Sequence, residues 1–258
     1  MDAERVNCAE NNIRMSIPNL HKVPYQIKSL KICRYNPNIH LSPFVVVISY
    51  KLNCFFPMLL DELIAVQEHY VHNFSFRRSC REGICGSCAM NINGFNTLAC
   101  LYQVDPLVHS NIVMPLAHMP IVRDLIVSLR HFYSQYRSIE PWVHLPTKGM
   151  PIVSQLEVQR TLLDGLYECI LCACCSTSCP SYWWNSDTYL GPAVLLQALR
   201  WIVDSRDNNT FDRLLNLNDT FKLYRCHSIL NCTQSCPKGL NPAVAISAIK
   251  KLVNNLIT

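Results

Sequence analysis

The sequence contains little glycine and lacks the motifs that bind phosphate groups. Only 7 of its 258 residues are glycine, and neither GxGxxG nor GxxxxGK[ST] occurs anywhere. Both motifs bring backbone N–H groups against the phosphates of a dinucleotide or a nucleoside triphosphate. The chain therefore offers no site for such a ligand, and a flavin or nicotinamide is expected on another subunit if the function requires one.

Long apolar runs and charge of one sign are also missing. No apolar run reaches the roughly 18–20 residues that a membrane span needs. The net charge of +5 is spread along the chain, without the basic tract expected for nucleic-acid binding. The first residues, Met1 to Arg5, are acidic, unlike a mitochondrial presequence, and no secretory signal follows them. Membrane contact, where it occurs, is expected to be peripheral or made through partners.

Cysteine, in contrast, is abundant. The chain has 15 cysteines, an odd number, and no export signal. In a chain of this kind, such a count indicates metal ligation rather than a disulfide framework. Most of these cysteines fall into three groups, at residues 80–100, 169–179 and 226–236.

The first half of the chain has the signals of a small α+β domain. Val45–Ile48 is a β-branched run, and Phe74–Phe76 alternates as a strand does. Asn93 and Gly94 tolerate positive φ and predict a hairpin turn. Apolar residues recur at helical spacing from Leu59 to Tyr70 and predict one helix.

The second half has helical periodicity. Helices are predicted at residues 122–136, at 156–167, from Pro192 to about residue 203, and from Pro242 onward, with a loop at 140–153. We place the domain boundary near residue 118. The predicted divisions are an unassigned extension at 1–21, a first domain at 22–118 and an all-helical domain at 119–258.

The first cysteine group has the plant-type spacing for a [2Fe–2S] cluster. Three cysteines are spaced x4 and x2, and a fourth follows the last of these after eleven intervening residues. Gly83 and Gly86 permit the loop to curl and to direct N–H groups at sulfur. A structural zinc site is the alternative, but zinc prefers separated CxxC pairs. The predicted ligands are Cys80, Cys85, Cys88 and Cys100.

The second group has the spacing of a bacterial ferredoxin. Its cysteines are separated by x2, x2 and x3, and Pro180 follows the last one. In ferredoxins with two clusters, the first three cysteines of such a run bind one cluster and the fourth binds the other. With a reciprocal cysteine from the third group, the predicted [4Fe–4S] ligands are Cys169, Cys172, Cys175 and Cys236.

The third group repeats this pattern with one gap. Ile229 stands where a complete repeat would have a cysteine. One iron of a cubane would have no ligand there, so a [3Fe–4S] cluster is predicted on Cys179, Cys226 and Cys232. Water or a partner residue at this corner is the alternative. The remaining cysteines are interpreted as small apolar residues: Cys8, Cys33, Cys54 and Cys174.

The segments around these cysteines, at 76–90, 166–185 and 224–242, resemble the iron–sulfur subunit of succinate dehydrogenase (respiratory complex II). The resemblance covers roughly residues 22–258. It implies a plant-type ferredoxin (β-grasp) domain followed by a helical bacterial-ferredoxin-like domain. It further implies an FAD-containing flavoprotein subunit that oxidises succinate, two membrane-anchor subunits, and ubiquinone as the acceptor of electrons that pass through [2Fe–2S], [4Fe–4S] and [3Fe–4S].

The resemblance also implies quinone contacts at Ser181, Trp184, His227 and Ile229. An indole N–H and an imidazole can hydrogen-bond quinone oxygens, and histidine can supply protons near neutral pH. Trp183 and Trp184 could alternatively be core aromatics. His227 could instead donate to a cluster sulfur. The arginines in the first cysteine segment are either flavoprotein contacts or solvated charges: Arg77, Arg78 and Arg81.

The sequence thus predicts an electron-transfer subunit of succinate:ubiquinone oxidoreductase, which does not itself oxidise succinate. The expected location is the matrix side of the mitochondrial inner membrane, or the cytoplasmic face of a bacterial membrane. One alternative is the equivalent subunit of a quinol:fumarate reductase, because cluster potentials vary widely with their surroundings. A zinc-loaded structural module is the alternative from another class.

Overall fold

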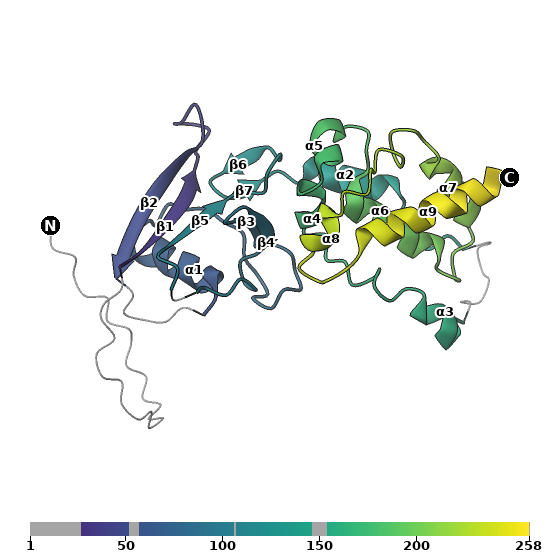
Figure 1. The fold of residues 1–258 in the computed structure, drawn as a ribbon, viewed down its shortest axis with the longest axis horizontal. Coiled ribbons are helices and arrows are strands. Elements are labelled where there is room, and N and C mark those ends of the chain that lie inside the picture. Colours follow the sequence, from purple (N-terminus) through teal and green to yellow (C-terminus); the bar gives the residue numbers. More distant parts are fainter. Residues whose placement is uncertain (1–26, 52–56, 106, 146–153, 258) are drawn as a thin grey trace, which may run out of the picture.

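The computed structural model describes residues 27–51, 57–105, 107–145 and 154–257. Two lobes follow one another along the long axis, a sheet with one covering helix and then a group of helices (Figure 1). This order confirms the predicted α+β first domain and the helical second domain. The predicted extension at 1–21, together with Cys8 and Cys54, lies outside the described residues.

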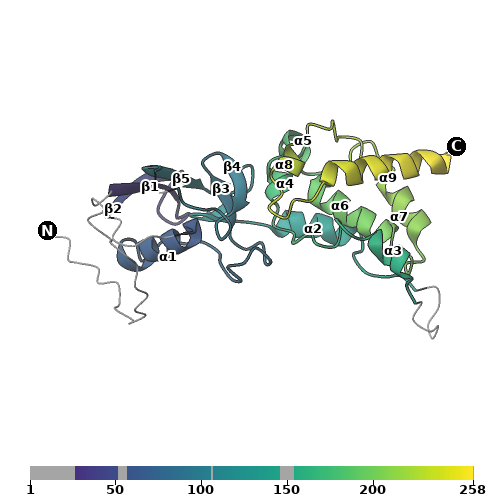
Figure 2. The same cartoon turned by 60° about the horizontal axis from the view of Figure 1, so that its bottom comes forward.

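The first lobe is built on a five-stranded mixed sheet of order β2-β1-β5-β3-β4. Its strands are β1 (Ile27–Arg34), β2 (Phe44–Lys51), β3 (Ala89–Ile92), β4 (Phe95–Leu98) and β5 (Ser110–Met114). Only β1 and β5 pair in parallel. Helix α1 (Leu59–His69), which the sequence predicts, lies against one face of this sheet (Figure 2). Its Leu59 and Leu63 are fully buried with Leu30 and Ile32 of β1.

The predicted hairpin is confirmed, because β3 and β4 pair across Asn93 and Gly94, which have φ of 50° and 90°. The predicted strand at Phe74–Phe76 is wrong. That segment is an irregular stretch, and Ser75 N donates to the carboxylate of Asp124 at 2.9 Å instead of to a neighbouring strand.

The helix predicted at 122–136 is correct only in its second half. Residues before it form a short hairpin of β6 (Ile121–Arg123) and β7 (Ile126–Val127), and α2 begins later (Arg130–Ser138). Asp124, at the turn with φ of 46°, is almost fully buried. Its carboxylate accepts from Arg34 Nε at 2.9 Å and from Tyr35 N at 3.0 Å. These contacts with the first lobe override the local helical pattern.

The second lobe contains short helices around the cysteine loops and two longer ones behind them. The bounds are α3 (Glu157–Thr161), α4 (Cys174–Thr177), α5 (Pro180–Asn185), α6 (Gly191–Ile202), α7 (Thr210–Leu217), α8 (Asn231–Gln234) and α9 (Pro242–Ile257). Helices α6 and α9 confirm their predictions. Helix α3 is shorter than predicted, since turns occupy residues 162–168 and Gly165 has a φ of 78°.

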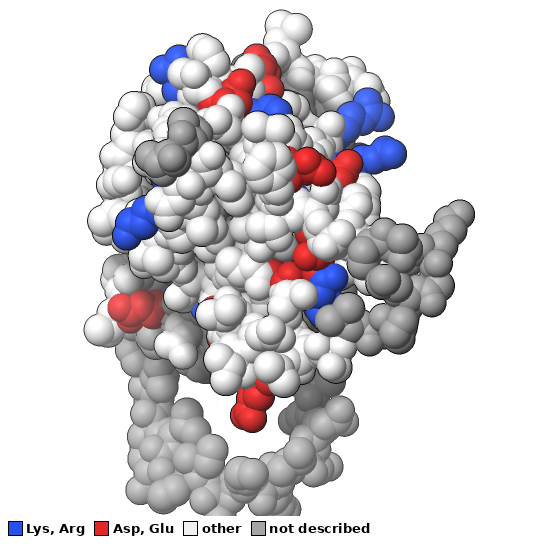
Figure 3. Space-filling model, turned by 90° about the vertical axis from the view of Figure 1, so that its right-hand side faces the viewer, with Lys and Arg blue, Asp and Glu red and all other residues white. Residues whose placement is uncertain are grey.

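Helix α6 is the centre of this lobe, because nearly all of its residues are buried. Helix α9 lies along it in both ribbon views (Figures 1 and 2). At the far end, Arg213 donates to the backbone oxygens of Ile139, Glu140 and Trp142 and pairs with Asp207. Viewed from that end, the surface carries scattered charges of both signs (Figure 3). No helix among the described residues is long and apolar enough to span a membrane.

The two lobes meet at their cysteine loops. Asn96 of β4 donates to Thr177 Oγ1 and Ser178 Oγ of the second lobe, both at 2.9 Å. Gly86 approaches so closely that an added Cβ would lie 3.0 Å from Cys172 Cβ and 3.1 Å from its Cα. The contact therefore joins the predicted [2Fe–2S] loop to the predicted [4Fe–4S] loop.

Candidate iron–sulfur centres

The second and third cysteine groups have the same backbone conformation. Leu171 and Ser228 have φ of 55° and 58°, and Ala173 and Leu230 have φ of 65° and 70°. In each pair the residues are 57 positions apart (171 to 228, 173 to 230). Ala173 and Leu230, the second positive-φ residue in each loop, directly precede the four-residue helices α4 and α8. The two loops are therefore structural repeats.

Each loop lines one cavity, and the two cavities are of similar size. The first comprises about 360 Å³ of space, in part open to solvent, and its lining includes Cys169, Cys172, Cys175 and Cys236. The second comprises about 340 Å³, also in part open to solvent, and its lining includes Cys179, Cys226 and Cys232. Each cavity thus receives one cysteine from the opposite group, in the reciprocal arrangement that the sequence predicts.

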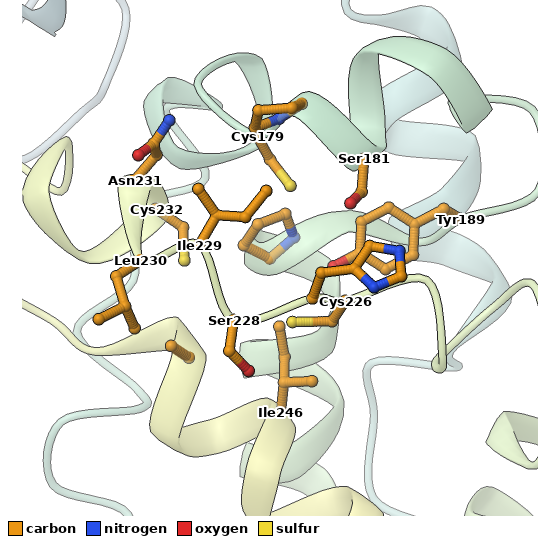
Figure 4. Close-up of a pocket in the computed structure, with 14 residues that line it drawn as sticks. Cys179, Ser181, Tyr189, Cys226, Ser228, Ile229, Leu230, Asn231, Cys232 and Ile246 are labelled. Atoms are coloured by element: carbon orange, nitrogen blue, oxygen red, sulfur yellow. The ribbon is translucent and has the colours of Figure 1, made fainter.

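Ile229 occupies the position of the repeat that corresponds to Cys172. It lines the second cavity beside its three cysteines (Figure 4). Its side chain has no group that can ligate iron, and half of its surface is exposed. Among the described residues, no group of three or more His, Cys, Asp or Glu side chains is placed to hold a single metal ion. The cysteines are instead arranged around the two cavities.

Burial dominates the electrostatics of these thiols. Burial raises the pKa of Cys175 well above its usual value, and the charges of Cys172 and Cys169 add to the rise. The pKa of Cys232 is raised by burial and by the charges of Cys179 and Cys226. A thiolate in such a place requires a compensating positive charge, which ligated iron would supply. The residues of both cavities therefore fit sulfur-ligated clusters.

Cys174 is fully buried, as predicted, and lines neither of the two cavities. Cys33 is also buried, within the core of the first lobe. Both fit the interpretation of these cysteines as small apolar residues.

The first cysteine loop directs backbone N–H groups at sulfur, as predicted. Cys80 Sγ accepts from Ile84 N and Cys85 N, both at 3.3 Å, and these bonds with one from Glu82 N lower the pKa of Cys80 to about 6. Gly83 and Gly86 have φ of 73° and 69° and provide the curl.

The other two predicted ligands of this loop lie deeper. Cys88 and Cys100 are buried, and burial raises the pKa of Cys88 to about 12. The charges of Cys100 and Cys85 act on Cys88 as well, so the thiols of the group are neighbours. The loop therefore has one buried face and one face open to solvent, where Cys85 is exposed.

Three of the four predicted quinone contacts lie together. Ser181, His227 and Ile229 line the second cavity, and His227 and Ile229 are exposed at its rim. Trp184 does not line this cavity; it is 74% exposed, so it is no core residue. Trp183 fits the alternative of a structural aromatic, because its indole N–H donates to Thr177 O at 2.6 Å.

Sequence reasoning missed two residues of this region. His118, from the first lobe, stacks on Trp183 at 4.3 Å between ring centroids and lies edge-on to Trp184. Tyr189 lines the second cavity from the turn before α6. Neither residue belongs to a spacing motif, so no pattern in the sequence indicates its place.

The fold and these cysteine sites define an iron–sulfur protein with two ferredoxin-type domains. Residues 29–134 match the family described as the 2Fe-2S iron-sulfur cluster binding domain, and residues 168–241 match the 4Fe-4S dicluster domain. A 2Fe-2S domain followed by a helical 4Fe-4S dicluster domain is the order that the resemblance found in the sequence implies.

Two solved structures share this fold. A chain of the Mycobacterium smegmatis Sdh1 complex in the apo form is 22% identical, with a TM-score of 0.81 over 90% of this chain and 97% of that one. A hypothetical protein from Helicobacter pylori is 15% identical, with a TM-score of 0.54 over 91% of this chain and 41% of that one.

Proposed function

We propose that this chain is the iron–sulfur electron-transfer subunit of a succinate:ubiquinone oxidoreductase. In this role it receives electrons from the FAD of a flavoprotein subunit and delivers them to ubiquinone beside two membrane-anchor subunits. The protein would lie peripherally on the matrix face of a mitochondrial inner membrane or the cytoplasmic face of a bacterial one. The similarity in fold to a chain of an Sdh1 complex supports this assignment.

The observation that carries the proposal is the reciprocal lining of two cavities of similar size, one with four cysteines and one with three plus Ile229. When bound, the three clusters would each accept and release one electron, with potentials set by their ligands and surroundings. The ligand assignments are those of the three cysteine groups: four thiolates for [2Fe–2S], four for [4Fe–4S] and three for [3Fe–4S].

The protein sets the distance between neighbouring sites and the exposure of the third site to solvent. Gly86 brings the [2Fe–2S] loop into contact with Cys172, so the first two sites are adjacent. The rim of the third site is open, with exposed His227 and Ile229, so a quinone head group could reach it from outside. In that position, His227 would donate to a quinone oxygen and deliver a proton. Buried Ser181 would hold the ring from within.

The decisive experiment is low-temperature EPR on the anaerobically purified chain with its iron content measured. We expect a nearly isotropic three-iron signal in the oxidised protein. On dithionite reduction it should disappear while the [2Fe–2S] signal appears. A protein that contains zinc without iron and is silent in both redox states would refute the relay and favour the structural module.

The quinone contacts are tested separately in the assembled complex. We expect His227→Ala and Trp184→Ala to lower quinone reduction while electron transfer to a soluble dye acceptor is retained. Tyr133→Ala is a control, since Tyr133 is also an exposed aromatic residue, at 48%, but lines the cavity between the lobes. Equal loss with both acceptors would place the defect upstream of quinone.

A further inference from the structure

Tyr189 is held rigidly at the back of the cavity lined by Cys179, Cys226 and Cys232. Its side chain has no exposed surface. Its backbone N–H donates to Asn185 O at 2.9 Å, and its backbone oxygen accepts from Gln135 Nε2 at 3.0 Å. The ring points into the space between the cysteines (Figure 4).

The hydroxyl of Tyr189 makes no hydrogen bond of good geometry among the described residues, although the thiol of Cys226 lies near it. A buried hydroxyl without a partner costs about 1–3 kcal/mol, and most such groups are satisfied in folded proteins. Phenylalanine would fill the same volume without this cost. The hydroxyl is therefore explained by an acceptor that occupies the cavity.

The chemical character of that acceptor follows from the surroundings. Tyr189 shares the cavity with Cys179, Cys226 and Cys232, whose sulfur atoms can accept a hydrogen bond. A phenol O–H in this position is therefore a donor that faces sulfur. The cavity of the other repeat provides no hydroxyl; apart from its cysteines it is lined by aliphatic side chains, prolines and Lys238.

We propose that the Tyr189 hydroxyl donates a hydrogen bond to a sulfur of the cluster held by Cys179, Cys226 and Cys232. This inference rests on the proposed function. The reduced cluster carries one more negative charge than the oxidised cluster. A donor therefore binds the reduced form more strongly, and hydrogen bonds to the sulfurs are among the factors that set cluster potentials. Tyr189 is thus a positioning residue that favours electron arrival at the third site.

The test is Tyr189→Phe in the full chain, followed by an EPR-monitored redox titration. We expect the three-iron midpoint potential to become more negative by about 59 mV, which corresponds to a tenfold change in a one-electron equilibrium. The other two clusters should keep their potentials. Tyr182→Phe is the matched control, because Tyr182 is also buried but donates to Gln135 Oε1 at 2.8 Å.

A second measurement separates this role from a packing role. After exchange into deuterium oxide, pulsed EPR of the three-iron signal should detect a coupled deuteron that is lost in Tyr189→Phe and kept in Tyr182→Phe. An unchanged potential with the deuteron still present would overturn the proposal and assign the contact to water. Absence of any three-iron signal in the unaltered protein would instead refute the proposed function.

Discussion

Residues 169–175 and 226–232 form two loops with one backbone conformation and different surroundings. Position 172 is a cysteine in contact with Gly86 of the first lobe, whereas the equivalent position 229 is a half-exposed isoleucine. Apart from its cysteines, the first cavity is lined by aliphatic side chains, prolines and Lys238, but Ser181, Tyr189, His227 and Asn231 line the second. The repeat therefore preserves the framework that holds sulfur, while single substitutions decide which cluster is built and what it faces.

The largest effect is expected from removing the residue that distinguishes the loops. Cys172→Ala should abolish the [4Fe–4S] signal, because three cysteines remain where four are required. EPR of the reduced protein and iron analysis provide the measurement. Cys174→Ala is the control, since this buried neighbour lines neither cavity. A [4Fe–4S] signal that survives in Cys172→Ala but not in Cys174→Ala would reverse the ligand assignment.

The converse change, a cysteine at position 229, should give the second cavity four cysteines like the first. Ile229→Cys restores the fourth ligand, so the oxidised three-iron signal should lose most of its amplitude and a second reduced cubane signal should appear. Leu230→Cys is a closely matched control, because both residues are 51% exposed but only position 229 corresponds to Cys172. Retention of the three-iron signal in Ile229→Cys would show that another group occupies the corner.

The next difference between the two loops is the contact of Cys172 with Gly86 of the first lobe. Gly86→Ala places a Cβ against the backbone of Cys172, so the loops must separate and electron exchange between the first two clusters should slow. The magnetic interaction between these clusters, measured by spin-relaxation enhancement, should weaken. Gly94→Ala carries comparable backbone strain, with φ of 90°, but its Cβ would meet nothing within 4 Å. Equal weakening in both variants would contradict the contact.

A change at a residue that lines neither cavity should alter stability alone. Asp204 at the end of α6 accepts from Arg200 and Arg206, and chiefly the Arg206 hydrogen bond lowers its pKa to about 2. The folded pKa is below the unfolded value, so this stabilisation is present above about pH 4 and is lost as the pH falls toward 2. Asp204→Asn should cost about 1–3 kcal/mol at pH 7 in denaturant unfolding, with all EPR signals kept.

The matched control for that change is Asp164→Asn. Asp164 pairs with Arg160 at 2.8 Å on an exposed surface, where water and salt screen the pair, so its loss should cost less than the loss of the Asp204 carboxylate. A larger effect from Asp164 than from Asp204 would contradict the assignment of the buried pair as the stabilising one.

Local patterns predicted the elements that local forces control. The hairpin at Asn93 and Gly94 forms because both residues tolerate positive φ, and α6 and α9 follow from strong helical periodicity. The helix expected from residue 122 fails at its start, because Asp124 bonds to Tyr35 and Ser75 of the first lobe. No window of the sequence contains those distant partners.

The sequence by itself determined the cysteine spacings and the single gap at Ile229, because ligand spacing within a short loop is a local property of the chain. The ferredoxin pattern predicted that Cys236 joins Cys169 and that Cys179 joins Cys226, and the tertiary structure brings these pairs together through the packing of two distant loops. It also placed Gly86 against Cys172 and aimed the Tyr189 hydroxyl into the second cavity. Such contacts arise from packing between segments, and no spacing rule encodes them.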